Sequence, residues 1–299
     1  MTQERPPQAP FNIVVGFATT GRAEVLGQTI ARLGNQTHQP SKIVISAISE
    51  RDFEGLKTAS VQIDTLMTGK GAAQQRNRII EMLDPRNIIV FFDDDFVPCD
   101  DYLERVLTIF QSHADVMMVT GTVLADGILG QGLSFETAVK IASGSAPDGA
   151  QVLSDVYNGY GCNMAFRADL LLDQNIRFDE NLPLYSWLED VDFSRQVGAS
   201  GRLVRASDVR GVHLGVKSGR TSGLRLGYSQ IVNPYYLIRK GTMSAKFGLR
   251  LALRNLLANL AKSFKPEPHI DRFGRLRGNL RGLRDILLGT ADPRNITDF

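Results

Sequence analysis

The spacing of buried strands is the feature that most constrains the fold of this chain. Apolar runs rich in β-branched residues occupy residues 12–19, 42–48 and 87–92, and helical patterns lie between them. These runs are apolar on both faces, which is typical of strands covered by helices on each side of a sheet. The alternation of strand and helix therefore predicts an α/β fold with a parallel sheet.

Further elements extend this pattern along the chain. Residues 61–67, 116–124 and 203–213 have the pattern of additional strands, the last as one or two short ones. Helices are expected over about 21–33, 69–83, 100–112, 188–197 and 230–240. Asp100 is well placed as the N-cap of the helix that it begins. The polar, Pro-rich residues 1–10 predict a flexible tail.

The composition excludes several protein classes. Hydrophobic residues make up 43% of the chain and charged residues 22%, which is typical of a globular protein. Cys99 and Cys162 match neither a metal-binding pattern nor a disulfide framework, so a reducing compartment is expected. The sequence has no apolar signal core and no run of membrane-spanning length, which predicts a cytoplasmic protein.

Three adjacent carboxylates, Asp93, Asp94 and Asp95, directly follow the apolar run 87–92. Ligands of open α/β sheets bind at the carboxyl ends of the strands, where these side chains would lie. Adjacent like charges raise each other's pKa or require a cation. A solvated turn that caps the next helix is the alternative. Because Asp93 and Asp95 point to one side of an extended chain, they can together bind a divalent metal and a diphosphate.

A second acidic group lies in the segment WLEDVDF. Glu189, Asp190 and Asp192 precede or begin a helix, where negative charge is stabilising in any protein. A carboxylate in a partly apolar pocket beside Trp187, the chain's one tryptophan, would instead have a raised pKa and act as a general base. Both interpretations stay open on the residues alone.

Basic residues and a histidine complete the candidates. His213 ends a short strand, and Lys217 and Arg220 follow it in a Gly-rich stretch, where they could neutralise a diphosphate. Arg76 lies early on the helix that follows GKG. Neither GxxxxGK[ST] nor GxGxxG is present, which disfavours a nucleoside triphosphatase or a dehydrogenase.

Taken in order, these segments resemble a family 2 glycosyltransferase with the GT-A fold. The resemblance covers residues 11–245 and rests on IVVGFATTGRAEVLGQTIARLGNQTHQPSKIVI, GKGAAQQRNRIIEMLDPRNIIVFFDDDFVP, GYGCNMAFRADLL, FDENLPLYSWLEDVDFSRQV and VHLG. It implies a Rossmann-like, mixed, mostly parallel sheet flanked by helices. The residues themselves predict a helical, basic region over 246–299 after it. The resemblance also implies an inverting transfer of sugar from a nucleoside-diphosphate sugar to an acceptor hydroxyl on a glycan or lipid-linked precursor.

The resemblance assigns roles position by position. Asp190 is implied as the catalytic base with Glu189 as its partner, and Asp95, Asp93 and His213 as ligands of Mn²⁺ or Mg²⁺. The implied substrate-binding residues are Ala18, Thr19, Arg22, Arg76, Asp93 and, on the acceptor side, Asn163. The residue patterns described above add Asp94, Trp187, Lys217 and Arg220 as further substrate-binding candidates.

One departure concerns the base of the donor. Family members commonly end the second strand in an acidic pair, whereas this chain has SAISERD there. Base recognition is therefore expected from Asp52 or from backbone groups. The family's habits favour UDP or dTDP, and GDP stays possible.

Two other functions compete with a transferase. A sugar-nucleotide pyrophosphorylase would share the sheet and the metal, but GFATTGRAE has too little of the Gly-rich, Arg-Lys loop that such an enzyme carries. A non-catalytic carbohydrate-binding or scaffolding protein has no need for Asp93, Asp95, Asp190 and His213 together.

The C-terminal region is basic and amphipathic. Residues 247–264 place Leu249, Leu253, Leu256, Leu257, Leu260 and Phe264 on one helical face. This pattern fits a helix lying on an anionic membrane, at the inner face of the cell membrane, and equally a helix packed on the catalytic domain. Nucleic acid is not expected as a partner because aromatic residues are sparse among the cations.

Overall fold

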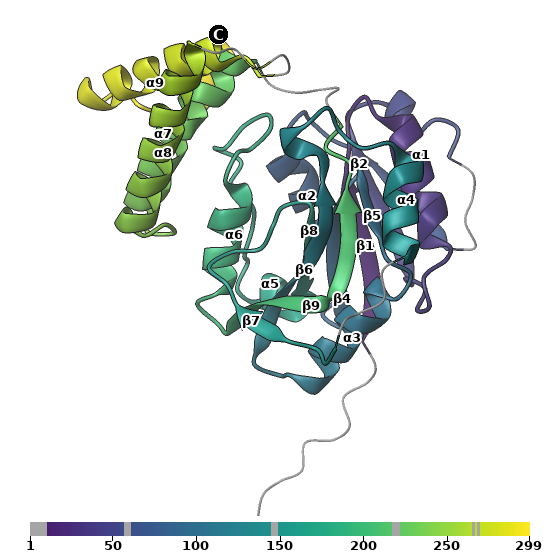
Figure 1. Cartoon of the computed structure of the whole chain (residues 1–299). Helices are drawn as coiled ribbons and strands as arrows, with labels where there is room; N and C mark the ends of the chain where they lie inside the picture. The colour runs from purple at the N-terminus through teal and green to yellow at the C-terminus, as the bar shows by residue number, and fades with distance from the viewer. Residues whose placement is uncertain (1–10, 57–60, 145–148, 217–221, 265–266, 268–269) are drawn as a thin grey trace, which may run out of the picture.

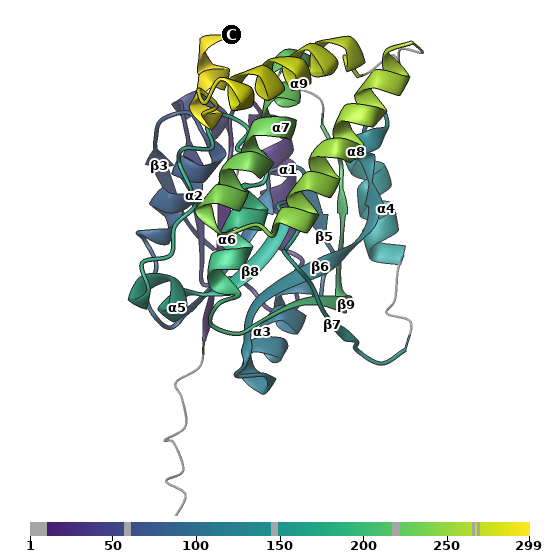
Figure 2. The same cartoon turned by 90° about the vertical axis from the view of Figure 1, so that its left-hand side faces the viewer.

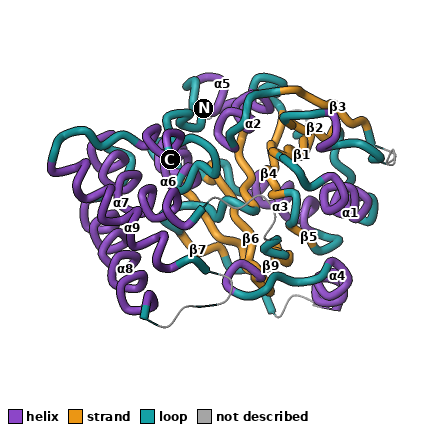
Figure 3. Tube along the Cα trace, turned by 90° about the horizontal axis from the view of Figure 1, so that it is seen from above, coloured by secondary structure: helices purple, strands orange, loops and turns teal. Residues whose placement is uncertain are grey.

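A computed structural model of the chain describes residues 11–56, 61–144, 149–216, 222–264, 267 and 270–299. A central sheet is flanked by helices, and three C-terminal helices gather at one side of it (Figures 1 and 3). Among the described residues, no helix is both long and apolar enough to cross a bilayer.

Nine strands of the described chain form one sheet in the order β3-β2-β1-β4-β8-β6-β9-β5, with β7 paired to β9. The neighbours β3, β2, β1 and β4 are parallel, whereas β8 is antiparallel to both β4 and β6. The strands are β1 (Asn12–Ala18), β2 (Lys42–Ala47), β3 (Gln62–Met67), β4 (Asn87–Asp93), β5 (Phe96–Pro98), β6 (Val116–Asp126), β7 (Leu153–Asp155), β8 (Asn163–Arg167) and β9 (Arg202–His213).

The α-helices cover both faces of the sheet and continue beyond it. They are α1 (Ala23–Leu33), α2 (Ala72–Ile80), α3 (Tyr102–Ser112), α4 (Phe135–Gly144), α5 (Ala168–Asp173), α6 (Glu189–Val197), α7 (Gly223–Lys240), α8 (Ala245–Ser263) and α9 (Arg272–Leu287). Short 3₁₀ turns are η1 (Glu50–Asp52), η2 (Gly127–Leu129) and η3 (Pro293–Asp298).

Strand β4 shows why the apolar runs lack alternation. Its residues Val90 and Phe92 pack into the core on the side of α1 and α3, and Ile89 and Phe91 pack into the core on the side of α2, α5 and α6. Both sets are buried, since successive side chains of a strand point to opposite faces. The predicted α/β architecture is thus confirmed.

Strand pairing brings distant polar residues to one edge of the sheet. Ala18 at the end of β1 is the register partner of Asp93 at the end of β4. The short strand β5 pairs antiparallel with β9, which places His213 opposite Phe96, the residue after Asp95. The carboxyl ends of β1, β4 and β9 therefore meet at a common site, beside the amino end of β5.

Several local expectations differ from the structure. Residue Asp100 is not the N-cap of α3: the cap is Asp101, and Asp100 instead pairs with Arg32 at 2.5 Å. Residues 202–213 form one long strand rather than short pieces, and α7 begins at Gly223, before the expected 230–240. Helix α4 was not expected at all.

The C-terminal helices are joined by close backbone contact and a buried polar network. A Cβ atom on Gly278 of α9 would lie 2.1 Å from the carbonyl oxygen of Leu224 in α7. The buried Asn259 of α8 donates its amide at 2.8 Å both to Gln230 of α7 and to Asn279 of α9. Helices α7, α8 and α9 therefore pack closely against one another.

We expect Gly278→Ala to lower the free energy of unfolding by about 2 kcal/mol, because the added methyl overlaps the α7 backbone. Urea denaturation followed by circular dichroism measures the change. Gly144→Ala is the matched control: nothing lies within 4 Å of a Cβ there, so this helical substitution should be neutral or slightly stabilising. Equal stability of the two variants would contradict the close helix contact.

Candidate functional site

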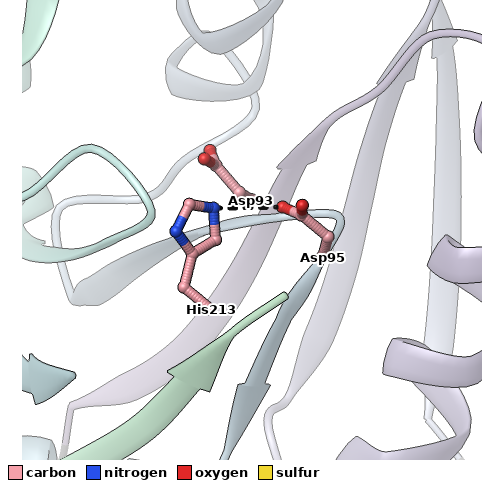
Figure 4. A group of neighbouring side chains, drawn as sticks. All are labelled: Asp93, Asp95 and His213. Atoms are coloured by element: carbon pink, nitrogen blue, oxygen red, sulfur yellow. Dashed lines mark ion pairs between the residues drawn. The ribbon is translucent and has the colours of Figure 1, made fainter. Parts of the chain in front are cut away.

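Asp93, Asp95 and His213 form a compact cluster at the carboxyl edge of the sheet (Figure 4). One ligand atom from each residue lies within 4.8 Å of the others. His213 Nε2 is 3.5 Å from an Asp95 carboxylate oxygen, and the other Asp95 oxygen accepts a hydrogen bond from the Val216 amide at 2.8 Å. Asp93 and Asp95 thus converge on one side of the chain, as the sequence predicts.

A third carboxylate, which sequence reasoning missed, orients the histidine. Asp126 at the end of β6 lies 2.9 Å from His213 Nδ1 and accepts a hydrogen bond from the Tyr160 hydroxyl at 2.8 Å. Burial alone would lower the pKa of His213. The hydrogen bonds to Asp126 and Asp95 and the negative charge of Asp95 have the larger effect and raise that pKa to about 10. No local motif marks Asp126, since only strand pairing brings it to His213.

Asp94 has other partners and holds the loop between β1 and α1 in place. Its carboxylate accepts hydrogen bonds from Thr19 Oγ1 and from Arg22, both at 2.8 Å, and its carbonyl accepts one from Thr29 at 2.8 Å. Burial raises the pKa of Asp94 to about 6, although the Arg22 charge opposes the rise. Thr19 and Arg22, two of the implied substrate-binding residues, therefore hold the loop between β1 and α1 to the acidic strand end.

A pocket of about 220 Å³ opens beside the acidic cluster. It brings together several predicted residues and three basic or aromatic ones that were not predicted, Lys70, Tyr185 and Arg225. Its lining is Ala18, Thr19, Thr20, Arg22, Lys70, Gly71, Ala72, Gln75, Asp93, Asp94, Leu184, Tyr185, Ser222 and Arg225. Lys70 lies within the GKG segment that the sequence singled out, whereas Arg225 has no local signal.

The loop before α6 forms one wall of this pocket in an unusual conformation. Leu184, Ser186 and Leu188 all have positive φ angles, of 60°, 52° and 73°. Such angles cost non-glycine residues free energy and occur where surrounding contacts impose them. The Leu184 carbonyl accepts a hydrogen bond from the Ala72 amide, and buried Ser186 accepts one from Ala73, so the N-terminus of α2 imposes the loop shape.

Glu189 and Asp190 begin α6 with different environments. Glu189 is buried and paired with Arg76, whereas Asp190 is partly exposed and accepts backbone hydrogen bonds from Val191 and Gly161. Burial raises the pKa of Glu189 to about 7 against the opposing charge of Arg76. Burial also raises the pKa of Asp190, and the Val191 amide partly offsets it.

Arg76, predicted to contact the donor, has protein partners in the structure. The Arg76 side chain is 4% exposed, and its guanidinium donates to Glu189, to Asp93 at 3.0 Å and to the Gly161 carbonyl at 3.1 Å. The side chain therefore links the acidic strand end to the start of α6 instead of facing the pocket.

The remaining predicted residues have structural partners. The Asp52 carboxylate accepts hydrogen bonds from the backbone amides of Gly21, Ile48 and Ser49, so it joins two loops. Asn163 is fully buried, and its side chain accepts hydrogen bonds from Tyr102 and from the Gly121 amide. The structure does not bring Asn163 to a surface.

Of the other predicted residues, Asp192 and Trp187 contact helix α7. Asp192 is buried and pairs with Lys240 at 2.8 Å, so it joins α6 to α7. The Trp187 carbonyl accepts a hydrogen bond from Asn233 of α7. The predicted Lys217 and Arg220 lie outside the described residues.

The known proteins that this chain is similar to are glycosyltransferases. No family model matches the sequence. A curated relative from Haloferax volcanii, described as glucosyl-dolichyl phosphate glucuronosyltransferase, is 24% identical over 169 residues, which cover 54% of this chain and 54% of the relative. The chain thus spans about half the length of that relative.

Solved structures extend the likeness over most of the chain. A mannosyltransferase from Pyrobaculum calidifontis, in complex with GDP-Man and Mn²⁺, has a TM-score of 0.56 and 14% identity over 95% of this chain and 91% of its own. S. aureus TarS in complex with UDP-GlcNAc has a TM-score of 0.56 and 13% identity over 94% of this chain and 82% of its own. These likenesses confirm the predicted resemblance to glycosyltransferases and the GT-A fold.

The pKa of Glu189 predicts a pH dependence of stability in metal-free buffer. Because this pKa is about 7 in the folded protein and 4.5 for an ordinary glutamate, the native state holds a proton that the unfolded chain releases. The free energy of unfolding should therefore fall as the pH rises from 4.5 to about 7, by up to about 3 kcal/mol.

Glu189→Gln should reduce this dependence, because the amide does not ionise, and the share of Asp94, whose pKa is also raised, should remain. Urea denaturation in EDTA across this pH range measures it. Exposed Glu81→Gln is the control and should keep the wild-type slope. A Glu189→Gln protein with an unchanged slope would contradict the assignment to Glu189.

Proposed function

We propose that this chain is a glycosyltransferase that moves a sugar from a nucleoside-diphosphate sugar to an acceptor hydroxyl. One observation carries the proposal: the Asp93, Asp95 and His213 cluster lies at the pocket edge, and Arg76 ties it to the start of α6, where Asp190 is partly exposed. A charge-stabilising group beside a candidate base is the arrangement that displacement of a diphosphate needs.

The cluster suits a hard divalent cation. The two carboxylates offer the oxygen ligands that Mn²⁺ and Mg²⁺ prefer, and the His213 imidazole adds a nitrogen ligand once the incoming cation displaces its proton. One ligand atom from each residue already lies within 4.8 Å of the others. Asp126 on the far nitrogen of His213 is the kind of partner that orients a metal-binding histidine. When bound, the cation would supply positive charge against the diphosphate leaving group.

The chain's own residues have separable tasks in an inverting displacement. Asp190 accepts the proton of the acceptor hydroxyl while that oxygen bonds to the anomeric carbon. The bond from this carbon to the diphosphate breaks, and its electron pair leaves with the diphosphate. Lys70 and Arg225 line the pocket, where their charges can hold the diphosphate.

The donor base and the acceptor are finer parts of the proposal. The solved neighbours carry GDP-Man and UDP-GlcNAc, which supports GDP and UDP as candidates for this chain. The sequence resemblance adds dTDP. The Asp52 oxygens already accept hydrogen bonds from backbone amides. We therefore assign recognition of the donor's nucleotide base to backbone groups of the loop between β1 and α1. The curated relative's name describes a dolichyl phosphate-linked acceptor, which supports a lipid-linked acceptor here.

Asp190→Asn should lower transfer at least about 100-fold while donor binding survives, since the amide keeps the shape of the carboxylate but cannot accept the proton. Transfer is measured with a panel of nucleotide sugars, and donor binding by thermal shift with UDP, dTDP and GDP. Asp173→Asn, an exposed substitution at the end of α5, is the control and should be fully active. Turnover near wild type in the Asp190 variant would remove the residue from this role.

Chelation by EDTA should stop transfer, and Mn²⁺ or Mg²⁺ should restore it, because the diphosphate charge would lose its counter-charge. Mn²⁺ binding measured by electron paramagnetic resonance gives a readout independent of activity. Asp95→Asn and His213→Ala should each weaken that binding about 10-fold or more, whereas Asp173→Asn should not. Full activity in chelator, or unchanged Mn²⁺ binding in both variants, would refute the metal assignment.

A further inference from the structure

Helices α8 and α9 present two apolar stripes to solvent. The stripe of α8 and its C-cap consists of residues that are between 45% and 82% exposed and recur at helical spacing: Leu249, Leu253, Leu257, Leu260 and the C-cap residue Phe264. The α9 residues are Phe273, Leu280, Leu283 and Leu287. Exposed apolar surface gathered in this way marks a site of interaction with a protein or a membrane.

The stripes are exposed because the opposite faces of both helices already have partners. On α8 the buried residues are Gly248 and Asn259, and on α9 they are Gly278, Asn279 and Gly282. The sequence left open whether the leucines of α8 pack on the catalytic domain. In the structure the packed face of α8 is a different one, formed by the residues that meet α7 and α9.

The charges beside the stripes are positive. Helix α8 contains no acidic residue, and the one acid of α9, Asp285, accepts a hydrogen bond from the Tyr228 hydroxyl. The exposed cations on the two helices are Lys246, Arg250, Arg254, Lys262, Arg277, Arg281 and Arg284. On a helical wheel Arg250 and Arg254 flank the α8 stripe, and Arg277, Arg281 and Arg284 flank the α9 stripe.

We propose that α8 and α9 form a docking surface for an anionic lipid bilayer. The stripes enter the boundary between headgroups and acyl chains, and the flanking cations contact lipid phosphates. A second copy of this chain fits less well, because it would bring the same cations face to face. Nucleic acid offers nothing to the exposed leucines.

Helix α7 links the docking surface to the pocket. Helix α7 packs against α8 and α9 (Figure 2), and Ser222 and Arg225 at its N-terminal end line the pocket. Docking would therefore hold the pocket near the bilayer, where a lipid-linked hydroxyl is presented. This last consequence rests on the proposed transfer, whereas the docking itself does not.

Flotation of the full chain with phosphatidylcholine vesicles, with or without phosphatidylglycerol, tests the docking. The wild type should float with the phosphatidylglycerol vesicles and much less with phosphatidylcholine alone. Leu249→Ser/Leu253→Ser/Leu257→Ser should stay unbound. Arg250→Gln/Arg254→Gln should bind more weakly, by about fivefold for each cation removed.

Matched controls show whether binding depends on this surface or on exposed apolar residues and cations anywhere on the protein. Met67→Ser/Val152→Ser removes exposed apolar residues elsewhere, and Arg86→Gln/Lys140→Gln removes exposed cations elsewhere; both should float like the wild type. Circular dichroism checks that each variant is folded.

Three outcomes would overturn the proposal. The first is flotation of the leucine variant equal to that of the wild type. The second is equal binding of the wild type to vesicles with and without phosphatidylglycerol. The third is a wild-type dimer in sedimentation that the leucine substitutions dissociate, because the stripes would then belong to a second copy. Failure of transfer with intact flotation would instead count against the proposed activity alone.

Discussion

The buried guanidinium of Arg76 is the contact on which the geometry of the site depends. It donates to Glu189 at the start of α6, to Asp93 at the end of β4 and to the carbonyl of Gly161. A buried charge is tolerated only when it is paired and fully hydrogen-bonded, so these segments must stay together. Because Asp190 follows Glu189, one side chain fixes the distance between the candidate base and the acidic cluster.

The mixed half of the sheet, from β8 to β5, adds what the parallel strands β3, β2, β1 and β4 lack. Strands β1 and β4 bring Ala18 and Asp93 to one edge, but they supply no imidazole. The register of β9 against β5 and β6 places His213 opposite Phe96 on one side and Asp126 on the other. A slip of one residue would turn the histidine to the opposite face of the sheet, since side chains alternate along a strand. The candidate metal cluster is therefore a consequence of strand register.

Helical periodicity predicted the C-terminal helices but not which face each would bury. The leucines of α8 are the most apolar stripe of that helix, yet the structure buries the face of Gly248 and Asn259 instead. Close approach at glycine and a shared amide network decide this packing, because both bring backbones nearer than leucine side chains permit. The same helical unit reaches the pocket through Arg225.

The sequence by itself determined the buried strands and the position of Asp93 and Asp95 at a strand end. These follow from local rules: apolar runs without alternation are buried on both faces, and side chains two residues apart point the same way. Only the tertiary structure decided that Arg76 pairs with protein carboxylates, that Asp126 orients His213 and that Asn163 is a core residue. A charged or polar side chain takes whichever partner the fold brings within hydrogen-bonding distance, and those partners lie far away along the chain.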